Sequence, residues 1–175
     1  MVEQAVQRLK GQVVEEEPDP TLRLSVSAYI PEDYVADSHQ RLSLYKRLSS
    51  CGQLGDLALM HGEIEDRYGH PPDPVERLFE LMQIRLLAKQ LRLSSVVEQP
   101  HAVVITFDPK ATVSETAVQA LMDRYKKRLR FLSPLSFELQ IPHEDWSLVF
   151  PELNATLQTL HVCGTNNQGP RTAST

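Results

Sequence analysis

The sequence of 175 residues has little of what secreted, membrane or redox proteins need. Its two cysteines, Cys51 and Cys163, form no C-x-x-C pair and no framework of the kind that small secreted domains use. No apolar run approaches the roughly 18 to 20 residues of a membrane helix, and the N-terminal residues lack the continuous apolar stretch of a signal peptide. We therefore expect a cytoplasmic protein with no membrane partner.

An excess of positive charge is also absent. The formal net charge is −5, so the chain as a whole is unsuited to wrapping nucleic acid. Hydrophobic residues make up 41% of the sequence, which is enough for a core without disulfides. The length leaves room for one domain of ordinary size and for tails.

The signatures of common enzyme sites are missing as well. There is no G-x-x-x-x-G-K-[ST] phosphate loop, no G-x-G-x-x-G turn and no G-x-S-x-G elbow. None of the six histidines lies four residues from another, and although His61 and Glu65 have that spacing, two ligands do not make a zinc site. The sequence thus predicts no catalytic residue, no cofactor and no metal.

Composition divides the chain into four parts. Residues 1–11 carry a short apolar stripe that ends at a glycine, and we expect them to be the remnant of a helix from a preceding unit. Residues 12–20 are acidic, contain two prolines and are typical of a linker. We expect residues 21–160 to form the compact domain and residues 161–175, which are small and polar, to be a disordered tail.

The first half of the domain shows one strand pattern and three helix patterns. Alternating apolar and polar residues predict the strand, and Asp37, with Gln40 at the capping-box position, begins the first helix, whose inner face would include Leu42. In the third helix Asp73 is the predicted N-cap and Glu76 its capping-box partner. Apolar residues surround that helix, so we expect it to be central and buried. The predicted ranges are 22–28 for the strand and 37–50, 53–68 and 73–93 for the helices.

The second half alternates between strands and helices. A strand pair at 95–99 and 102–107 precedes a helix at 114–129 capped by Ser114, and a strand at 137–141 precedes a closing helix at 144–160. The predicted fold class is α+β, with a layer of about five helices on a small mixed β-sheet.

One stretch of the second predicted helix, "HGEIEDRYG" at residues 61–69, is strongly acidic. At 100° per residue the inward stripe contains Leu57 and Ile64, so Glu63 and Asp66 point outward and are poorly placed for general acid and base work, which needs an apolar pocket or a cleft. The spacing i, i+3, i+7, i+10 puts four residues on one outward face, which we call the acidic strip: Asp56, Leu59, Glu63 and Asp66.

Two interpretations of the acidic strip remain open from spacing alone. It is either a solvated helix face with one tolerated leucine, or a docking surface with Leu59 as apolar anchor and the carboxylates awaiting arginines of another domain. A less favoured third interpretation is a small hydrolase using His61, Glu63 and Asp66, which predicts a raised carboxyl pKa and a concave pocket.

The second charge cluster is basic and lies at the end of the helix predicted over 114–129. Its cations would interact favourably with the helix C-terminus, or they would make this a nucleic-acid-binding accessory module, the alternative function. We call this cluster the basic run; it comprises Lys126, Lys127, Arg128 and Arg130.

Four segments in this order and spacing resemble the C-terminal domain of the bacterial transcription-repair coupling factors (Mfd): "AYIPEDYV", "RLSLYKRLS", "EIEDRYGHPPDPVERL" and "IRLLAKQLRL". The resemblance covers about residues 22–160 and is loose beyond His101. Residues 1–11 also resemble the helix at the end of the family's second motor lobe.

The resemblance implies a regulatory role in the bacterial cytoplasm. The family protein is an ATP-driven translocase on double-stranded DNA that removes stalled RNA polymerase and recruits UvrA through a UvrB-like N-terminal region. Its C-terminal domain is understood to pack on that region and to mask the UvrA-binding surface. The motor motifs, with their ATP and Mg²⁺, have no counterpart in this chain, so we expect it to be no enzyme by itself and to be monomeric.

The resemblance also implies site residues. The family's E-x-x-D acids, which contact arginines of the UvrB-like region, correspond to Glu63 and Asp66. The other two members of the acidic strip, Asp56 and Leu59, rest on the helical periodicity and not on the resemblance.

Overall fold

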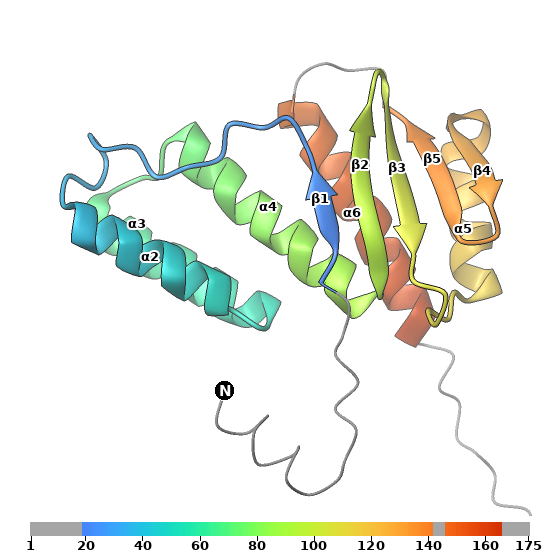
Figure 1. The fold of residues 1–175 in the computed structure, drawn as a ribbon, viewed down its shortest axis with the longest axis horizontal. Coiled ribbons are helices and arrows are strands. Elements are labelled where there is room, and N and C mark those ends of the chain that lie inside the picture. The colour runs from blue at the N-terminus through green and yellow to red at the C-terminus, as the bar shows by residue number, and fades with distance from the viewer. Residues whose placement is uncertain (1–18, 142–145, 166–175) are drawn as a thin grey trace, which may run out of the picture.

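A computed structural model of the chain describes residues 19–141 and 146–165 (Figure 1). The predicted helix at 1–11, most of the predicted linker and the tail from residue 166 lie outside these residues. The observed elements are β1 (Thr21–Arg23), α2 (Ser38–Ser50), α3 (Leu54–Tyr68), α4 (Asp73–Gln90), β2 (Leu93–Gln99), β3 (Ala102–Phe107), α5 (Glu115–Tyr125), the 3₁₀ turn η1 (Lys126–Arg128), β4 (Leu129–Ser133), β5 (Ser136–Gln140) and α6 (Trp146–Thr165).

The sheet is mixed and has the strand order β1-β2-β3-β5-β4. β1 runs parallel to β2, and the remaining neighbours are antiparallel. Helices α4, α5 and α6 cover one face of this sheet, while α2 and α3 lie beside it against α4 (Figure 1). The predicted α+β class, with a helical layer on a small mixed sheet, is confirmed.

The buried side chains form two groups. The larger, which we call the sheet core, joins the sheet to α5, α6 and the C-terminal half of α4. The smaller, the helical core, joins α2 and α3 to the N-terminal half of α4. Val75 and Phe79 of α4 therefore belong to the helical core, whereas Ile84 and Leu87 belong to the sheet core. The prediction that this helix is central and buried is confirmed.

The predicted start of α4 is wrong in detail. Pro72, with φ −72° and ψ 160°, is the N-cap, Asp73 is the first helical residue, and no side chain caps the helix. Glu76 does not reach back to the cap because its carboxylate contacts His61 of α3, with both oxygens 3.0 Å from Nε2.

The start of α2 follows the prediction more closely. Asp37 is the N-cap, and its Oδ1 accepts hydrogen bonds from the backbone N–H of His39 and Gln40. Gln40 completes no capping box, since its Oε1 accepts a hydrogen bond from the Tyr68 hydroxyl of α3. The inner face of α2, predicted to contain Leu42, Tyr45 and Leu48 or Ser49, is confirmed in part. Leu48 is buried and Tyr45 is partly buried, but Leu42 is 53% exposed because Leu44 takes the buried position.

Three predicted boundaries also differ from the structure. The predicted strand at 22–28 is reduced to β1, after which the chain leaves the sheet without regular structure. β4 was not predicted, because a left-handed residue, Lys126 with φ 48°, ends α5 early and returns the chain to the sheet. α6 continues through residues 161–165, which were predicted to belong to the tail. No helix within the described ranges is long and apolar enough to cross a membrane.

Candidate docking face on helix α3

The acidic strip lies on the outer side of α3, as its spacing predicts. Leu57, Met60 and Ile64 are buried and turn the opposite flank of the helix toward solvent. Leu59 is 78% exposed, which is the highest exposure among the large hydrophobic residues of the described chain. An apolar side chain so fully in water contributes nothing to the core, so it is available for contact with another surface.

Glu63 is the one member of the strip that is tied to neighbouring cations. Arg47 of α2 donates from Nη1 and Nη2 to its two oxygens at 2.9 and 2.5 Å, and Arg67 donates to Oε1 at 3.3 Å. The hydrogen bonds from Arg47 lower the pKa of the Glu63 carboxyl to about 2, with a further contribution from Arg67. Glu63 is therefore ionised at neutral pH, and it joins α2 to α3.

The other two acids are free of such partners. Asp56 and Asp66 are exposed, and neither makes an ion pair with another described residue. Their negative charge is therefore not compensated locally, so a cation from outside would meet it directly. Asp66 is the stronger candidate of the two, since it lies one turn beyond Glu63 on the same flank.

A groove of about 330 Å³ runs between α2 and α3 beside Leu59. Three members of the acidic strip line it, together with residues that the sequence did not assign to a site; the lining residues are Arg47, Ser50, Cys51, Asp56, Leu59, Met60 and Glu63. Burial raises the pKa of the Cys51 thiol, with Asp56 adding to the effect, so the thiol stays protonated at neutral pH. The groove offers an apolar floor between an arginine and two carboxylates.

The hydrolase hypothesis is wrong. His61 turns to α4, where its ring contacts Glu76 and packs edge-on against Phe79 with centroids 4.8 Å apart. The pKa of Glu63 is lowered rather than raised. No general acid and base pair is therefore assembled on α3. Among the described residues no group of three or more His, Cys, Asp or Glu side chains could hold a metal ion.

The basic run is divided by the fold. Arg128 forms an ion pair with Glu152 of α6 and donates from Nε to the Gln140 carbonyl at 3.0 Å. Arg130 lies 3.4 Å from Glu138 on the neighbouring strand. Two of the four cations are therefore neutralised within the fold.

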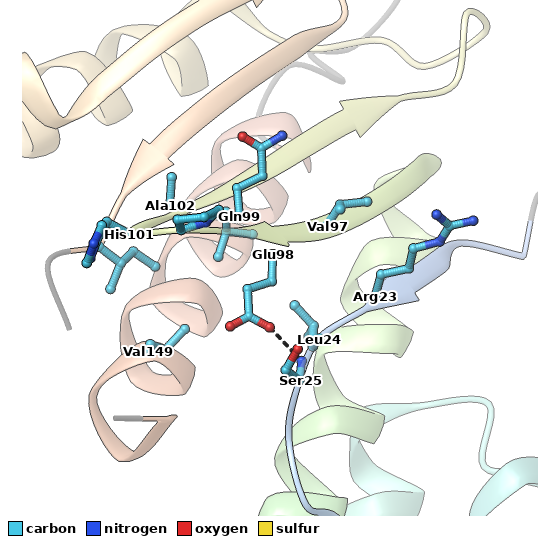
Figure 2. Close-up of a pocket in the computed structure, with 12 residues that line it drawn as sticks. Arg23, Leu24, Ser25, Val97, Glu98, Gln99, His101, Ala102 and Val149 are labelled. Atoms are coloured by element: carbon cyan, nitrogen blue, oxygen red, sulfur yellow. Dashed lines mark hydrogen bonds between the residues drawn. The ribbon is translucent and has the colours of Figure 1, made fainter. Parts of the chain in front are cut away.

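A cavity of about 680 Å³ lies away from α3, between the end of β1, the β2–β3 hairpin and α6 (Figure 2). Figure 2 shows Arg23 and His101 at opposite ends of this cavity, with Glu98 between them. Glu98 accepts a hydrogen bond from the Ser25 backbone N–H at 2.6 Å. The charged groups do not converge on one point, and no sequence motif indicated this cavity.

Known proteins resemble this chain in sequence. The family described as the TRCF domain matches residues 24–118. The transcription-repair-coupling factor of Myxococcus xanthus is 32% identical over 142 residues, and that of Mycobacterium bovis is 35% identical over 97 residues. These matches cover 81% and 54% of this chain but only 12% and 8% of the relatives, so the chain spans a small part of their length.

A solved structure resembles it in fold. The crystal structure of the C-terminal domain of a transcription-repair coupling factor superimposes with a TM-score of 0.75 at 16% identity, and the match covers 86% of this chain and 97% of that domain. This likeness shows the fold, and the family match over more than half of the sequence shows the relationship. The chain therefore belongs to the TRCF domain family of transcription-repair coupling factors.

Proposed function

We propose that this chain is an autoinhibitory docking domain of a bacterial, cytoplasmic transcription-repair coupling factor. In the resting protein the acidic strip would bind the UvrB-like region and mask the surface that recruits UvrA. The full protein would be an ATP-dependent translocase on double-stranded DNA that acts on RNA polymerase, and this chain would regulate it without contributing to the motor.

The exposure of Leu59 between the carboxyl groups of the acidic strip is the observation that carries this proposal. An apolar side chain at the centre of a contact, surrounded by charges, is the arrangement of a binding hot spot. Asp66 and Asp56 have no partner among the described residues, so each could accept hydrogen bonds from an arginine of the UvrB-like region. Glu63 carries two oxygens, and Arg47 and Arg67 fill only part of their acceptor capacity.

The mechanism would be a shift in population. If the contact favours the closed state by about 3 kcal/mol, the open form that binds UvrA is held below about 1%. Motion of the motor would then break the contact and expose the UvrA surface. A clamp of this strength is typical of a reversible switch, since a much stronger one would not open.

The test is a titration of this chain against the separately expressed UvrB-like region at low and moderate salt. We compare the wild type with Asp66→Arg and with Glu63→Arg/Asp66→Arg. Asp66→Arg is the cleaner variant, because Glu63→Arg also removes the bridge to α2 and places three arginines together. Glu65→Arg is the matched control, since it lies on the opposite flank of the same helix and makes the same change in charge.

Loss of binding in Asp66→Arg, with binding retained in Glu65→Arg, is the expected result. A tether supplies a high effective concentration, so the same variants are also compared in the full-length protein, with UvrA binding as the readout. There Asp66→Arg should raise UvrA binding and leave the intrinsic ATPase unchanged. Equal UvrA binding by the wild type, Asp66→Arg and Glu63→Arg/Asp66→Arg would show that the acidic strip is not the clamp.

A further inference from the structure

The outer edge of β4 is a second surface that the proposed docking function does not use. β4 is the last strand in the sheet order, and no other described strand pairs with its outer edge. Its backbone N–H and C=O groups on that side are therefore open to another extended chain. The strand is also poorly covered, since four of its five residues are exposed.

Two of the four exposed side chains of β4 are large and apolar. Phe131 is 48% exposed and Leu132 47% exposed. Phe131 leans against the buried Phe137 of β5, with ring centroids 6.2 Å apart, so only one side of its ring is covered. An open edge that carries large apolar side chains matches the surfaces that bind extended peptides by strand addition.

Uncompensated positive charge lies at the beginning of this strand. Arg130 is held by Glu138 and Arg128 by Glu152, but Lys126 and Lys127 are exposed and form no ion pair with described residues. The left-handed turn at Lys126 brings this charge to the N-terminal end of β4. Charge and apolar surface thus occupy successive parts of one edge.

We propose that β4 binds an extended, acidic segment of a partner protein by antiparallel strand addition. Antiparallel pairing is the slightly more stable kind and is the one that β4 already makes with β5. In that direction the acids of the partner lie at its C-terminal end, opposite Lys126 and Lys127, and its apolar residues lie opposite Phe131. The basic run then serves protein recognition instead of nucleic-acid binding.

A second copy of this chain fits the edge less well. Paired antiparallel through its own β4, it would place the residues that follow β4, which include no acid before Glu138, opposite the two lysines. A partner of opposite charge therefore remains.

The test uses a fluorescent peptide of sequence Thr-Val-Thr-Val-Thr-Glu-Glu-Glu, titrated by anisotropy against the whole chain. We expect saturable binding, with slower amide hydrogen exchange at residues 129–133. Lys127→Glu should weaken the affinity about tenfold, whereas the matched control Lys46→Glu on α2 should not change it. Leu132→Lys, which adds a charge to an already exposed position of the edge, should weaken it as well.

Peptide and nucleic-acid controls make the proposal falsifiable. The reversed peptide, with its acids at the N-terminal end, and a version with proline at the central valine should bind at least about tenfold more weakly, because direction and a backbone N–H are both required. Equal binding by either control peptide overturns strand addition. No binding of the first peptide, protection outside β4, or preferential binding of a DNA duplex that Lys127→Glu abolishes would each overturn the proposal.

Discussion

The sheet core and the helical core differ in size. Within the described residues the sheet core contains nineteen buried residues and the helical core ten, so apolar burial alone favours the sheet side of the molecule. Polar contacts between elements supplement both cores: on the sheet side the hydroxyls of Tyr125 and Thr156 lie 2.8 Å apart, and the helical core has two tyrosine contacts. The Tyr68 hydroxyl donates to Gln40 at 2.8 Å, and the Tyr34 hydroxyl donates to the Gly69 carbonyl at 2.6 Å.

This difference shows where a regulatory surface is most easily accommodated. The acidic strip belongs to the smaller core, and one of its members, Glu63, is itself part of the contact between α2 and α3. Binding at the strip therefore competes with, or reinforces, the packing of its own layer. The sheet core is linked to that layer through α4, which contributes buried residues to both cores, and through Leu54 of α3, which packs partly buried against the sheet core.

The largest expected effect is in the sheet core. Ile105 is fully buried on β3, so Ile105→Ala removes apolar volume from the centre of the larger core. We expect the free energy of unfolding to fall by about 3 to 5 kcal/mol. Urea denaturation followed by circular dichroism measures the free energy of unfolding. A decrease of less than about 1 kcal/mol would show that this core relaxes around the cavity.

The corresponding change in the helical core should act more locally. Ile64→Ala on α3 should cost about 2 to 4 kcal/mol, and amide hydrogen exchange should accelerate in α2 and α3 far more than in β2 and β3. Equal acceleration of exchange in all four elements would show that the two cores unfold as one cooperative unit.

A smaller effect is expected from acid. The pKa of Glu63 is about 2, below its ordinary value of 4.5, so its ionised form stabilises the folded state above pH 4.5. That contribution is lost as the pH falls from 4.5 to about 2. Carboxyl ¹³C chemical shifts should follow this titration, and Arg47→Gln should move the pKa of Glu63 upward. An unchanged pKa in Arg47→Gln would show that Arg47 does not hold this carboxylate.

The smallest effect on stability is expected at Leu59. Because this side chain is 78% exposed, Leu59→Ala should alter the free energy of unfolding by no more than about 0.5 kcal/mol. The same variant should nevertheless weaken binding to the UvrB-like region, since the anchor of the proposed contact is gone. A clear loss of stability would place Leu59 among the structural residues of the helical core.

The sequence predicted most of what depends on periodicity. The buried stripe of α3, the strand pair β2–β3 and the Ser114 cap of α5 are all as predicted, because each rests on a repeat or on a local hydrogen bond. The outward position of the acidic strip follows from the same periodicity.

What depends on neighbours distant in sequence could not be predicted. The sequence suggests that Lys46 and Arg47 pair with acids of the neighbouring helix, but it does not indicate that Arg47 would bind both oxygens of Glu63. The inner face of α2 is set by the extended segment before it, where the Ile30 N–H donates to the Tyr45 hydroxyl, and this contact has no signature in the sequence. β4 could not be predicted because its sequence, LRFLS, lacks a regular alternation of apolar and polar residues.

Among the described elements, helix α4 alone contributes fully buried residues to both cores, and this has a mechanical consequence. Its 18 residues form a strut of about 27 Å that is anchored at one end under the acidic strip and at the other under the sheet. Leu59 of α3 is thereby coupled to the sheet through the packing of α3 on α4. The half of the domain that contains α2 and α3 should then move as one body relative to the half that contains the sheet.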